Sequence, residues 1–262
     1  MEFGLCIEMA LTHLPFEQRL AKAAEIGFKN VEMWLVGDNY KGTPEHLAEV
    51  AAKAGVRVTN TVIGPPDGSI GGGLTNPARR EDWLARARMT FDFNKRANIP
   101  ATIVCTGNTV DGMSDAEMEH SVLDGLKATV DLAEKEGITL LLEPLNLPYD
   151  HKGYWLDSSD RGADLVRRIG SKHFRLLFDC YHMQIMEGDL VNHIRRNLDT
   201  IGHFHSAGVP GRFEHYNGEI NYPFLIAEIE KMGYTGIFGL EYQPSIKDQE
   251  ASVRNVLKHL TV

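Results

Sequence analysis

The chain has 262 residues, of which 43% are hydrophobic and 24% charged, with 25 glycines and 11 prolines. This balance is typical of a soluble globular protein and excludes collagen-like, intrinsically disordered and disulfide-stapled classes. The formal net charge of −9 opposes tight, sequence-independent binding to nucleic acid or to anionic lipid.

Cysteine usage and the start of the chain indicate the cellular compartment. Cys6, Cys105 and Cys180 are widely spaced and include no CxxC pair, so we expect reduced thiols and no thiolate zinc site. Glu2 and Glu8 interrupt the first residues, which lack the basic region and long apolar run of a secretory signal. No stretch reaches the roughly 18 consecutive apolar residues of a membrane span. We therefore expect a cytoplasmic protein with no membrane partner.

Short β-rich runs alternate with longer amphipathic segments along the whole chain, which is typical of βα units around a parallel sheet. Ser114 with Glu117 matches a capping box at a helix start, and Gly137 marks the end of the same helix. Strands are expected at 3–7, 30–33, 56–60, 101–104, 138–142, 174–178, 201–205 and 236–240. Helices are expected at about 16–26, 44–54, 77–97, 115–136, 159–169, 189–198, 221–232 and 247–260.

Strict alternation without a linker predicts an α/β fold, a single (β/α)₈ TIM barrel domain over residues 1–262, with an open doubly wound sheet as the alternative. The loop at 64–73, which reads GPPDGSIGGG, is either a mobile lid or a plain surface loop. It lacks the GKS or GKT ending of a phosphate-binding loop, and the chain contains no GxGxxG, GxSxG or HExxH motif. We therefore expect no nucleotide cofactor.

Four neighbouring strands end in side chains that bind metals. Glu143, Asp179, His205 and Glu241 close the fifth to eighth predicted strands, and the carboxyl ends of parallel barrel strands meet at one mouth. A single acid there is more often bonded to backbone amides, but four ligand-type residues in register favour a shared site. Three carboxylates and one imidazole suit Mg²⁺ or Mn²⁺, and without a cation the clustered charges would be costly.

Two of these acids are also candidates for proton transfer. Glu143 and Glu241 follow very apolar strands, where burial raises a carboxyl pKa towards a range useful for general acid–base catalysis. Each glutamate can use one oxygen for the cation and keep the other for the substrate. This arrangement favours proton transfer next to a carbonyl, with the cation stabilising the enediolate oxygens.

Further side chains are candidate substrate contacts, each with a structural alternative. His182, three residues after Asp179, binds a substrate oxygen or packs in the loop after the sixth strand. Arg212 either clamps a carboxylate or is a solvated loop residue, and Trp34 and Asn108 follow strands whose ends line the pocket. His203 shares the inward parity of His205, so it fills the barrel mouth or orients a ligand.

The segments LLLEPLN, FDCYHMQIMEGDL, HFHSAGVPGRFEHYNGEINYP and GLEYQP resemble hydroxypyruvate isomerases, within the xylose isomerase-like barrel superfamily. The match is densest from residue 138 to 244. It implies a single (β/α)₈ barrel that interconverts hydroxypyruvate and 2-hydroxy-3-oxopropanoate, with proton carriers at Glu143 and Glu241. The related ketose 3-epimerases imply Mn²⁺, Co²⁺ or Mg²⁺ on those glutamates with Asp179 and His205, and a substrate contact at His182. The ketose 3-epimerases have a second glutamate at the position where this chain has Tyr149.

We therefore predict a divalent-metal-dependent aldose–ketose isomerase, an intramolecular oxidoreductase, acting on hydroxypyruvate or a related short 2-oxo acid. A ketose 3-epimerase or a 2-oxo-tetronate isomerase would use the same residues. A metal-dependent endonuclease of the same superfamily and a non-catalytic sugar-binding barrel are remote alternatives. The expected partner is a small 2-oxo acid or sugar and not nucleic acid, while a homo-oligomer stays open.

Overall fold

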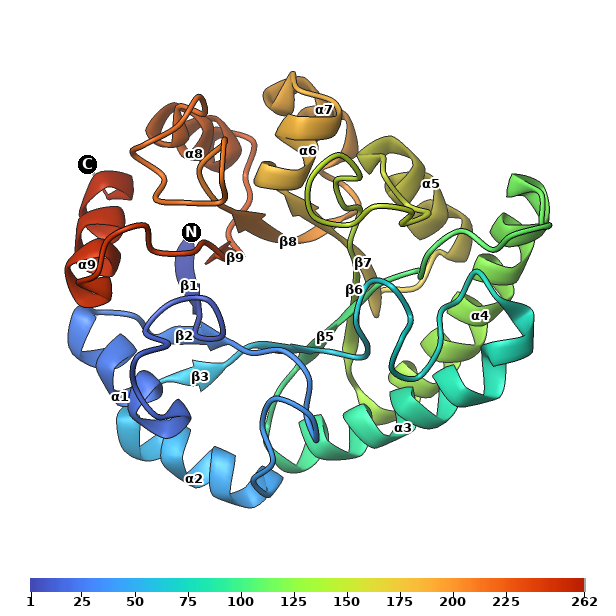
Figure 1. The fold of residues 1–262 in the computed structure, drawn as a ribbon, viewed down its shortest axis with the longest axis horizontal. Coiled ribbons are helices and arrows are strands. Elements are labelled where there is room, and N and C mark those ends of the chain that lie inside the picture. The colour runs from blue at the N-terminus through green and yellow to red at the C-terminus, as the bar shows by residue number, and fades with distance from the viewer. Residues whose placement is uncertain (262) are drawn as a thin grey trace.

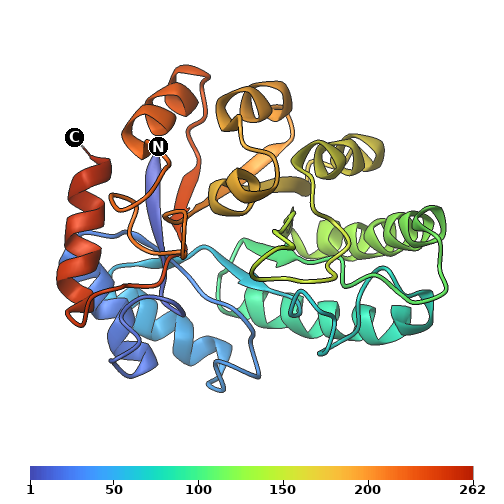
Figure 2. The same cartoon turned by 45° about the horizontal axis from the view of Figure 1, so that its top comes forward.

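The structure is a computed structural model that describes residues 1–261. Within them, the strands form one all-parallel sheet in the order β3-β2-β1-β9-β8-β7-β6-β5-β4. The sheet curls into a barrel with the helices outside it (Figures 1 and 2). The strands are β1 (Glu2–Cys6), β2 (Asn30–Glu32), β3 (Arg57–Val58), β4 (Asn60–Val62), β5 (Ala101–Val104), β6 (Thr139–Leu142), β7 (Phe174–Asp179), β8 (Ile201–Ser206) and β9 (Ile237–Leu240).

The barrel closes where one predicted strand is divided in two. The sequence predicts a continuous strand at 56–60, whereas Thr59 separates β3, which pairs with β2, from β4, which pairs with β5. The Thr59 amide donates to Val31 O at 2.9 Å, and the Met33 amide donates to Asn60 O at 3.3 Å. One segment thus bridges the two ends of the sheet, and the predicted TIM barrel is confirmed.

The outer helices follow the predicted alternation, with one addition after β7. Cys180–Met186 forms helix α6 where the sequence analysis predicted a loop, because Asp179 caps it by accepting from the Tyr181 and His182 amides. The other helices are α1 (Phe16–Ile26), α2 (Pro44–Ala54), α3 (Arg80–Arg96) after the 3₁₀ turn η1 (Pro77–Arg79), α4 (Asp115–Glu136), α5 (Ser159–Ile169), α7 (Leu190–Asn197), α8 (Tyr222–Lys231) and α9 (Gln249–Leu260).

Helix α4 shows how local sequence sets an element's ends. Ser114 accepts from the Glu117 amide while Glu117 bonds back to the Ser114 amide, so the predicted capping box is present. Gly137 ends the helix at φ 71°, a left-handed conformation that suits a residue without a Cβ atom. Within residues 1–261, no helix combines the length and apolar character that crossing a membrane requires.

Strand β8 shows how the barrel divides its two faces. Phe204 lies on the outer face, where its ring stacks on Phe238 with centroids 5.7 Å apart. The residues on either side of it, His203 and His205, point into the barrel, because successive side chains on a strand alternate between faces. The apolar face holds the helices against the sheet, and the other face supplies imidazoles to the interior.

Candidate active site

The four predicted metal-type residues converge at one place in the barrel. Glu143, Asp179, His205 and Glu241 each offer a ligand atom, and these atoms all lie within 4.8 Å of one another. His205 Nδ1 lies 3.5 Å from Glu143 Oε1 and 3.5 Å from Glu241 Oε2. Among residues 1–261, neither His205 Nδ1 nor Glu143 Oε1 finds a hydrogen-bond partner, although both are buried. Buried polar atoms of this kind are rare unless something else binds them.

Asp179 is placed by the junction between β7 and α6. Its Oδ1 accepts from the Tyr181 amide at 2.7 Å and from the His182 amide at 3.3 Å, which fixes the carboxylate plane. The other oxygen, Oδ2, remains available to the cluster. One side chain therefore begins a helix and still presents an oxygen to the site.

His205 is oriented by a residue that the sequence analysis did not single out. Glu32, at the end of β2, lies 2.6 Å from His205 Nε2 through one oxygen and 3.0 Å from His203 Nε2 through the other. A carboxylate has no proton to give, so His205 donates from Nε2, and its other nitrogen, Nδ1, faces the cluster. His203 shares this carboxylate and does not reach the four-residue cluster.

The electrostatics of the cluster favour a positive charge at its centre. Burial and the neighbouring Glu143 carboxylate raise the pKa of Asp179 to about 7. Burial alone would lower the pKa of His205, but the carboxylates of Glu241 and Glu32 outweigh it and raise that pKa well above its usual value. A bound cation would offset the repulsion among these carboxylates, so that none of them would have to be protonated. The donor set, its close spacing and the two unpartnered atoms therefore fit a hard divalent ion.

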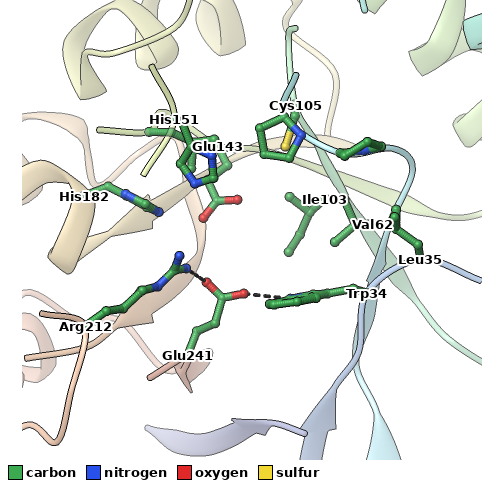
Figure 3. A pocket seen from close by; sticks show the side chains of 13 residues that line it. Trp34, Leu35, Val62, Ile103, Cys105, Glu143, His151, His182, Arg212 and Glu241 are labelled. Carbon is green, nitrogen blue, oxygen red and sulfur yellow. Dashed lines mark hydrogen bonds and ion pairs between the residues drawn. The ribbon is translucent and has the colours of Figure 1, made fainter. Parts of the chain in front are cut away.

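Glu241 differs from the sequence prediction in its acidity. Burial raises a carboxyl pKa, but here Arg212 and His205 outweigh burial and hold the pKa of Glu241 well below its usual range. Glu241 Oε1 accepts from Trp34 Nε1 at 2.9 Å, and Oε2 is paired with Arg212 (Figure 3). Both oxygens are thus engaged, whereas Glu143 Oε1 is buried without a hydrogen-bond partner within the described residues.

His182 lies on α6, not in the predicted loop, and its protonated nitrogen is fixed. The Asn146 side-chain amide lies 2.7 Å from His182 Nδ1, and the Asn146 backbone amide donates to the same nitrogen at 3.3 Å. Burial and the Arg212 charge lower the pKa of His182 well below its usual value, so the ring is neutral. Its hydrogen is therefore on Nε2, which lies 3.5 Å from Asp179 Oδ2.

A cavity of about 250 Å³ lies against the cluster. This is just below the roughly 300–1,000 Å³ of sites for drug-sized ligands, so the cavity suits a small molecule. Of the predicted substrate contacts, Trp34, His182 and Arg212 line it, together with Pro65 and Pro66 from the loop at 64–73. The other lining residues are Leu35, Val62, Ile103, Cys105, Glu143, Leu145, His151 and Glu241.

The prediction for Asn108 does not hold for the cavity. Asn108 forms an isolated bridge with Tyr154, and its carbonyl accepts from Thr75 Oγ1 at 2.7 Å. It is not among the residues that line the cavity. The segment after β5 turns away at Gly107, whose φ of 96° suits glycine and whose Cα would lie 2.9 Å from a Cβ placed on Gly73.

Comparison with known proteins places this geometry in a family. The model for the xylose isomerase-like TIM barrel matches residues 20–261. The chain belongs to this family.

Two relatives bear names that refer to the same reaction class. A putative hydroxypyruvate isomerase from Homo sapiens is 34% identical over 86% of this chain and 83% of its own length. A 2-oxo-tetronate isomerase from Cupriavidus necator is 30% identical over 92% of both chains. A crystal structure titled AP endonuclease, family 2, from Brucella melitensis has a TM-score of 0.88 and 27% identity over 96% of both chains. The predicted resemblance to hydroxypyruvate isomerases is confirmed.

Proposed function

We propose that this chain is a divalent-metal-dependent aldose–ketose isomerase whose substrate is a short 2-oxo acid, with hydroxypyruvate as the first candidate. The observation that carries the proposal is the pair of glutamates that flank His205 Nδ1 at 3.5 Å, beside a small cavity. The names of the human and Cupriavidus necator relatives support the same class of reaction.

The metal would be held by Glu143, Asp179, His205 and Glu241, with Mg²⁺ or Mn²⁺ as the candidates. When bound, such an ion stabilises negative charge that develops on the substrate oxygens. Glu32 keeps Nδ1 of His205 directed at this site. This contact orients the imidazole, and Nδ1 would give up its proton when an ion binds.

Glu143 is the residue to which we assign the first proton transfer, because its Oε1 is buried next to the cavity without a partner. It would take a proton from the hydroxymethyl carbon of hydroxypyruvate, and the electrons of that C–H bond would form the enediolate. The neighbouring carbon, C2, then takes up a proton, and so does its oxygen. The hydroxyl on C3 loses its proton and becomes the aldehyde oxygen, which gives 2-hydroxy-3-oxopropanoate. Glu241, 3.5 Å from the same nitrogen of His205, is the assigned carrier for the return to carbon: it would deliver a proton taken up from water, and Glu143 would later release the proton it has removed to water.

The test is isomerisation of hydroxypyruvate by the purified protein with Mg²⁺ or Mn²⁺, in deuterium oxide, followed by NMR. Deuterium on the product carbon is expected, because the proton that Glu241 delivers comes from the solvent. Glu143→Gln should lower kcat by about 10² to 10⁴, whereas Glu49→Gln, an exposed change on α2, should leave it unchanged. Undiminished turnover by Glu143→Gln would refute the assignment.

A 2-oxo-tetronate isomerase is the second candidate, favoured by the Cupriavidus necator relative, which matches 92% of this chain. Parallel assays with hydroxypyruvate, 2-oxo-tetronate and neutral ketoses, with epimerisation at C3 followed in the same samples, decide between these activities. Endonuclease activity is not expected, because Arg212 is the single lysine or arginine among the cavity-lining residues and the chain has a net charge of −9. Cleavage of abasic DNA at rates above a metal-only blank would instead favour the endonuclease over the isomerase.

A further inference from the structure

His151 is a cavity-lining residue that the proposed mechanism does not use. It lies on the segment between β6 and α5, where its amide donates to Asn146 O at 3.1 Å and its carbonyl accepts from the Tyr154 amide at 3.0 Å. Its ring packs against the His182 ring, with centroids 5.3 Å apart. The backbone and the neighbouring ring together hold this imidazole at the cavity.

The ring of His151 is distinguished from the other site histidines by its free nitrogens. His205 is bonded to Glu32 and His182 to Asn146, whereas no group within residues 1–261 hydrogen-bonds the ring of His151. The side chain is only partly buried. Burial lowers its pKa, against the opposing effect of Glu143, so the neutral ring presents one N–H donor and one acceptor.

Unpartnered donors gather on one side of the cavity. His182 Nε2 and Arg212 Nε are buried without hydrogen-bond partners in the described chain, and His151 lines the same cavity. Figure 3 shows the three side chains on the side of the cavity that also carries Glu143. Three N–H donors of this kind match the oxygens of a carboxylate, which accepts several hydrogen bonds and donates none.

The opposite wall offers nothing comparable. Leu35, Val62 and Ile103 form it, with Trp34 below them (Figure 3). The indole N–H of Trp34 is already donated to Glu241. An anionic group placed against this wall would lose its hydration without gaining hydrogen bonds, which is strongly unfavourable. The acid end of a substrate therefore belongs on the side of His151.

We propose that His151 is a substrate-binding residue that hydrogen-bonds the carboxylate of a short 2-oxo acid, beside His182 and Arg212, and thereby selects an acid over a neutral ketose. This inference rests on the proposed function, because it names the substrate class that the same site accepts. Its distinct content is that the selection depends on the ring N–H of His151, and not only on the arginine.

The kinetic test compares hydroxypyruvate with dihydroxyacetone, in which a neutral hydroxymethyl group replaces the carboxylate. His151→Phe keeps a planar ring against His182 and removes the N–H, so KM for hydroxypyruvate should rise about 10- to 100-fold, with a smaller change in kcat. KM for dihydroxyacetone should stay the same. His151→Gln, which restores a donor, should recover part of the loss, and the exposed change His120→Phe on α4 is the matched control.

A binding experiment separates this inference from the proposed function. Calorimetry with D-glycerate, an acid that cannot isomerise this way, should show a Kd about 10-fold or more higher for His151→Phe than for the unsubstituted protein, with glycerol as the neutral comparison. If no isomerase activity is found, the proposed function fails while this comparison still decides the role of His151. Equal glycerate affinities, or an equal rise of KM for acid and neutral substrates, would overturn the inference.

Discussion

Glu32 illustrates how much one buried side chain determines at the residue scale. It bonds two imidazoles at 2.6 and 3.0 Å, and burial is outweighed by these imidazoles, which lower its pKa below the usual range. It thus stays a carboxylate and holds the His205 ring with Nδ1 facing the cluster. Loss of this partner should leave the four ligands present but the imidazole poorly oriented.

Glu32→Gln should therefore weaken cation binding about 10- to 100-fold, because an amide cannot accept from both imidazoles. Calorimetric titration of the metal-free protein with Mn²⁺ measures this without reference to catalysis. Glu49→Gln makes the same chemical change on the exposed face of α2 and should bind Mn²⁺ like the unsubstituted protein. An unchanged affinity in Glu32→Gln would mean that the strand alone orients His205.

His215 gives a pH-dependent contribution to stability. Its ring is buried between Tyr222 and Tyr242, with Nε2 2.8 Å from Ser206 Oγ and with Glu214 and His259 as the charged neighbours, and burial lowers its pKa to about 3. Below about pH 6.5 the His215 ring therefore binds a proton in the unfolded chain, whereas in the folded chain it stays neutral until the pH approaches 3.

The free energy of unfolding should thus fall as the pH drops below about 6.5, by up to about 2 kcal/mol at pH 5 from this group. His215→Phe removes the titrating ring, so its stability should decline less between pH 7 and pH 5. Urea denaturation of both proteins at the two pH values measures the difference in slope. Parallel declines would show that the His215 ring becomes charged without cost in the folded state.

The walls of the cavity come from different elements, and this sets a prediction at the element scale. Val62 on β4 and Ile103 on β5 belong to the apolar wall, opposite the polar residues that follow β6 to β9. A hydroxyl pressed against these side chains loses water without gaining a partner, which costs about 1–3 kcal/mol. Any substrate carbon beyond the reacting hydroxyl-bearing carbon should therefore lack a hydroxyl group.

Of two four-carbon acids, 3-hydroxy-2-oxobutanoate should be isomerised with a higher kcat/KM than 2-oxo-tetronate, by about 10-fold. The two differ by the terminal hydroxyl. Val62→Thr adds a hydroxyl to the wall at nearly constant volume and should reduce the difference. A clear preference of the unsubstituted protein for 2-oxo-tetronate would contradict this description of the wall.

The same elements show what sequence periodicity predicts and where it fails. Strands at β5 to β9 and the long helix α4 follow from apolar patterning and caps, and the strand ends locate Glu143 and Asp179. Helix α6 was missed because its seven residues directly follow a strand, so no separate periodic segment marks it. Glu32 was missed because one acid in a three-residue strand has no local sign of its distant imidazole partners.

Other site features depend on contacts that a sequence does not contain. The apolar strand before Glu241 predicts burial and a raised pKa, but Arg212, 29 residues earlier, reverses the direction. Asn146 ends the quoted segment LLLEPLN and His151 lies beyond it, and the sequence analysis assigned a role to neither. An asparagine directly after the EPL tripeptide was the available signal, because a buried amide near a strand end often orients a neighbouring side chain.

At the scale of the whole molecule, one ion would join ligands at the ends of four strands, so ion binding should stabilise the folded barrel. The ligands are Glu143, Asp179, His205 and Glu241. With Mn²⁺ at about 100 times its Kd, the gain is about 2.7 kcal/mol, which raises Tm by roughly 5 to 10 °C for a chain of this size. A chelator should reverse the change. Scanning calorimetry of the chelated and Mn²⁺-loaded protein makes the measurement.

Asp179→Asn provides the control for this experiment. Asparagine still caps α6, so the metal-free variant should fold, but a neutral amide is a poorer ligand than a carboxylate. The rise in Tm with Mn²⁺ should therefore be much smaller than in the unsubstituted protein. A rise of the same size would indicate that Mn²⁺ stabilises the chain from elsewhere.

The barrel strands fall into two arcs, β6 to β9 and β2 to β5, and this division has a consequence for how such a protein diversifies. Every member of the cation cluster comes from β6 to β9, whereas Leu35, Val62 and Ile103 come from the segments of β2 to β5. Substitutions in the second arc can reshape what fits while the reactive groups stay in register. Selectivity for the end of the substrate away from its carboxylate is thus encoded largely apart from reactivity, so libraries confined to the first 105 or so positions, with Glu32 and Trp34 kept, should yield altered preferences without loss of turnover.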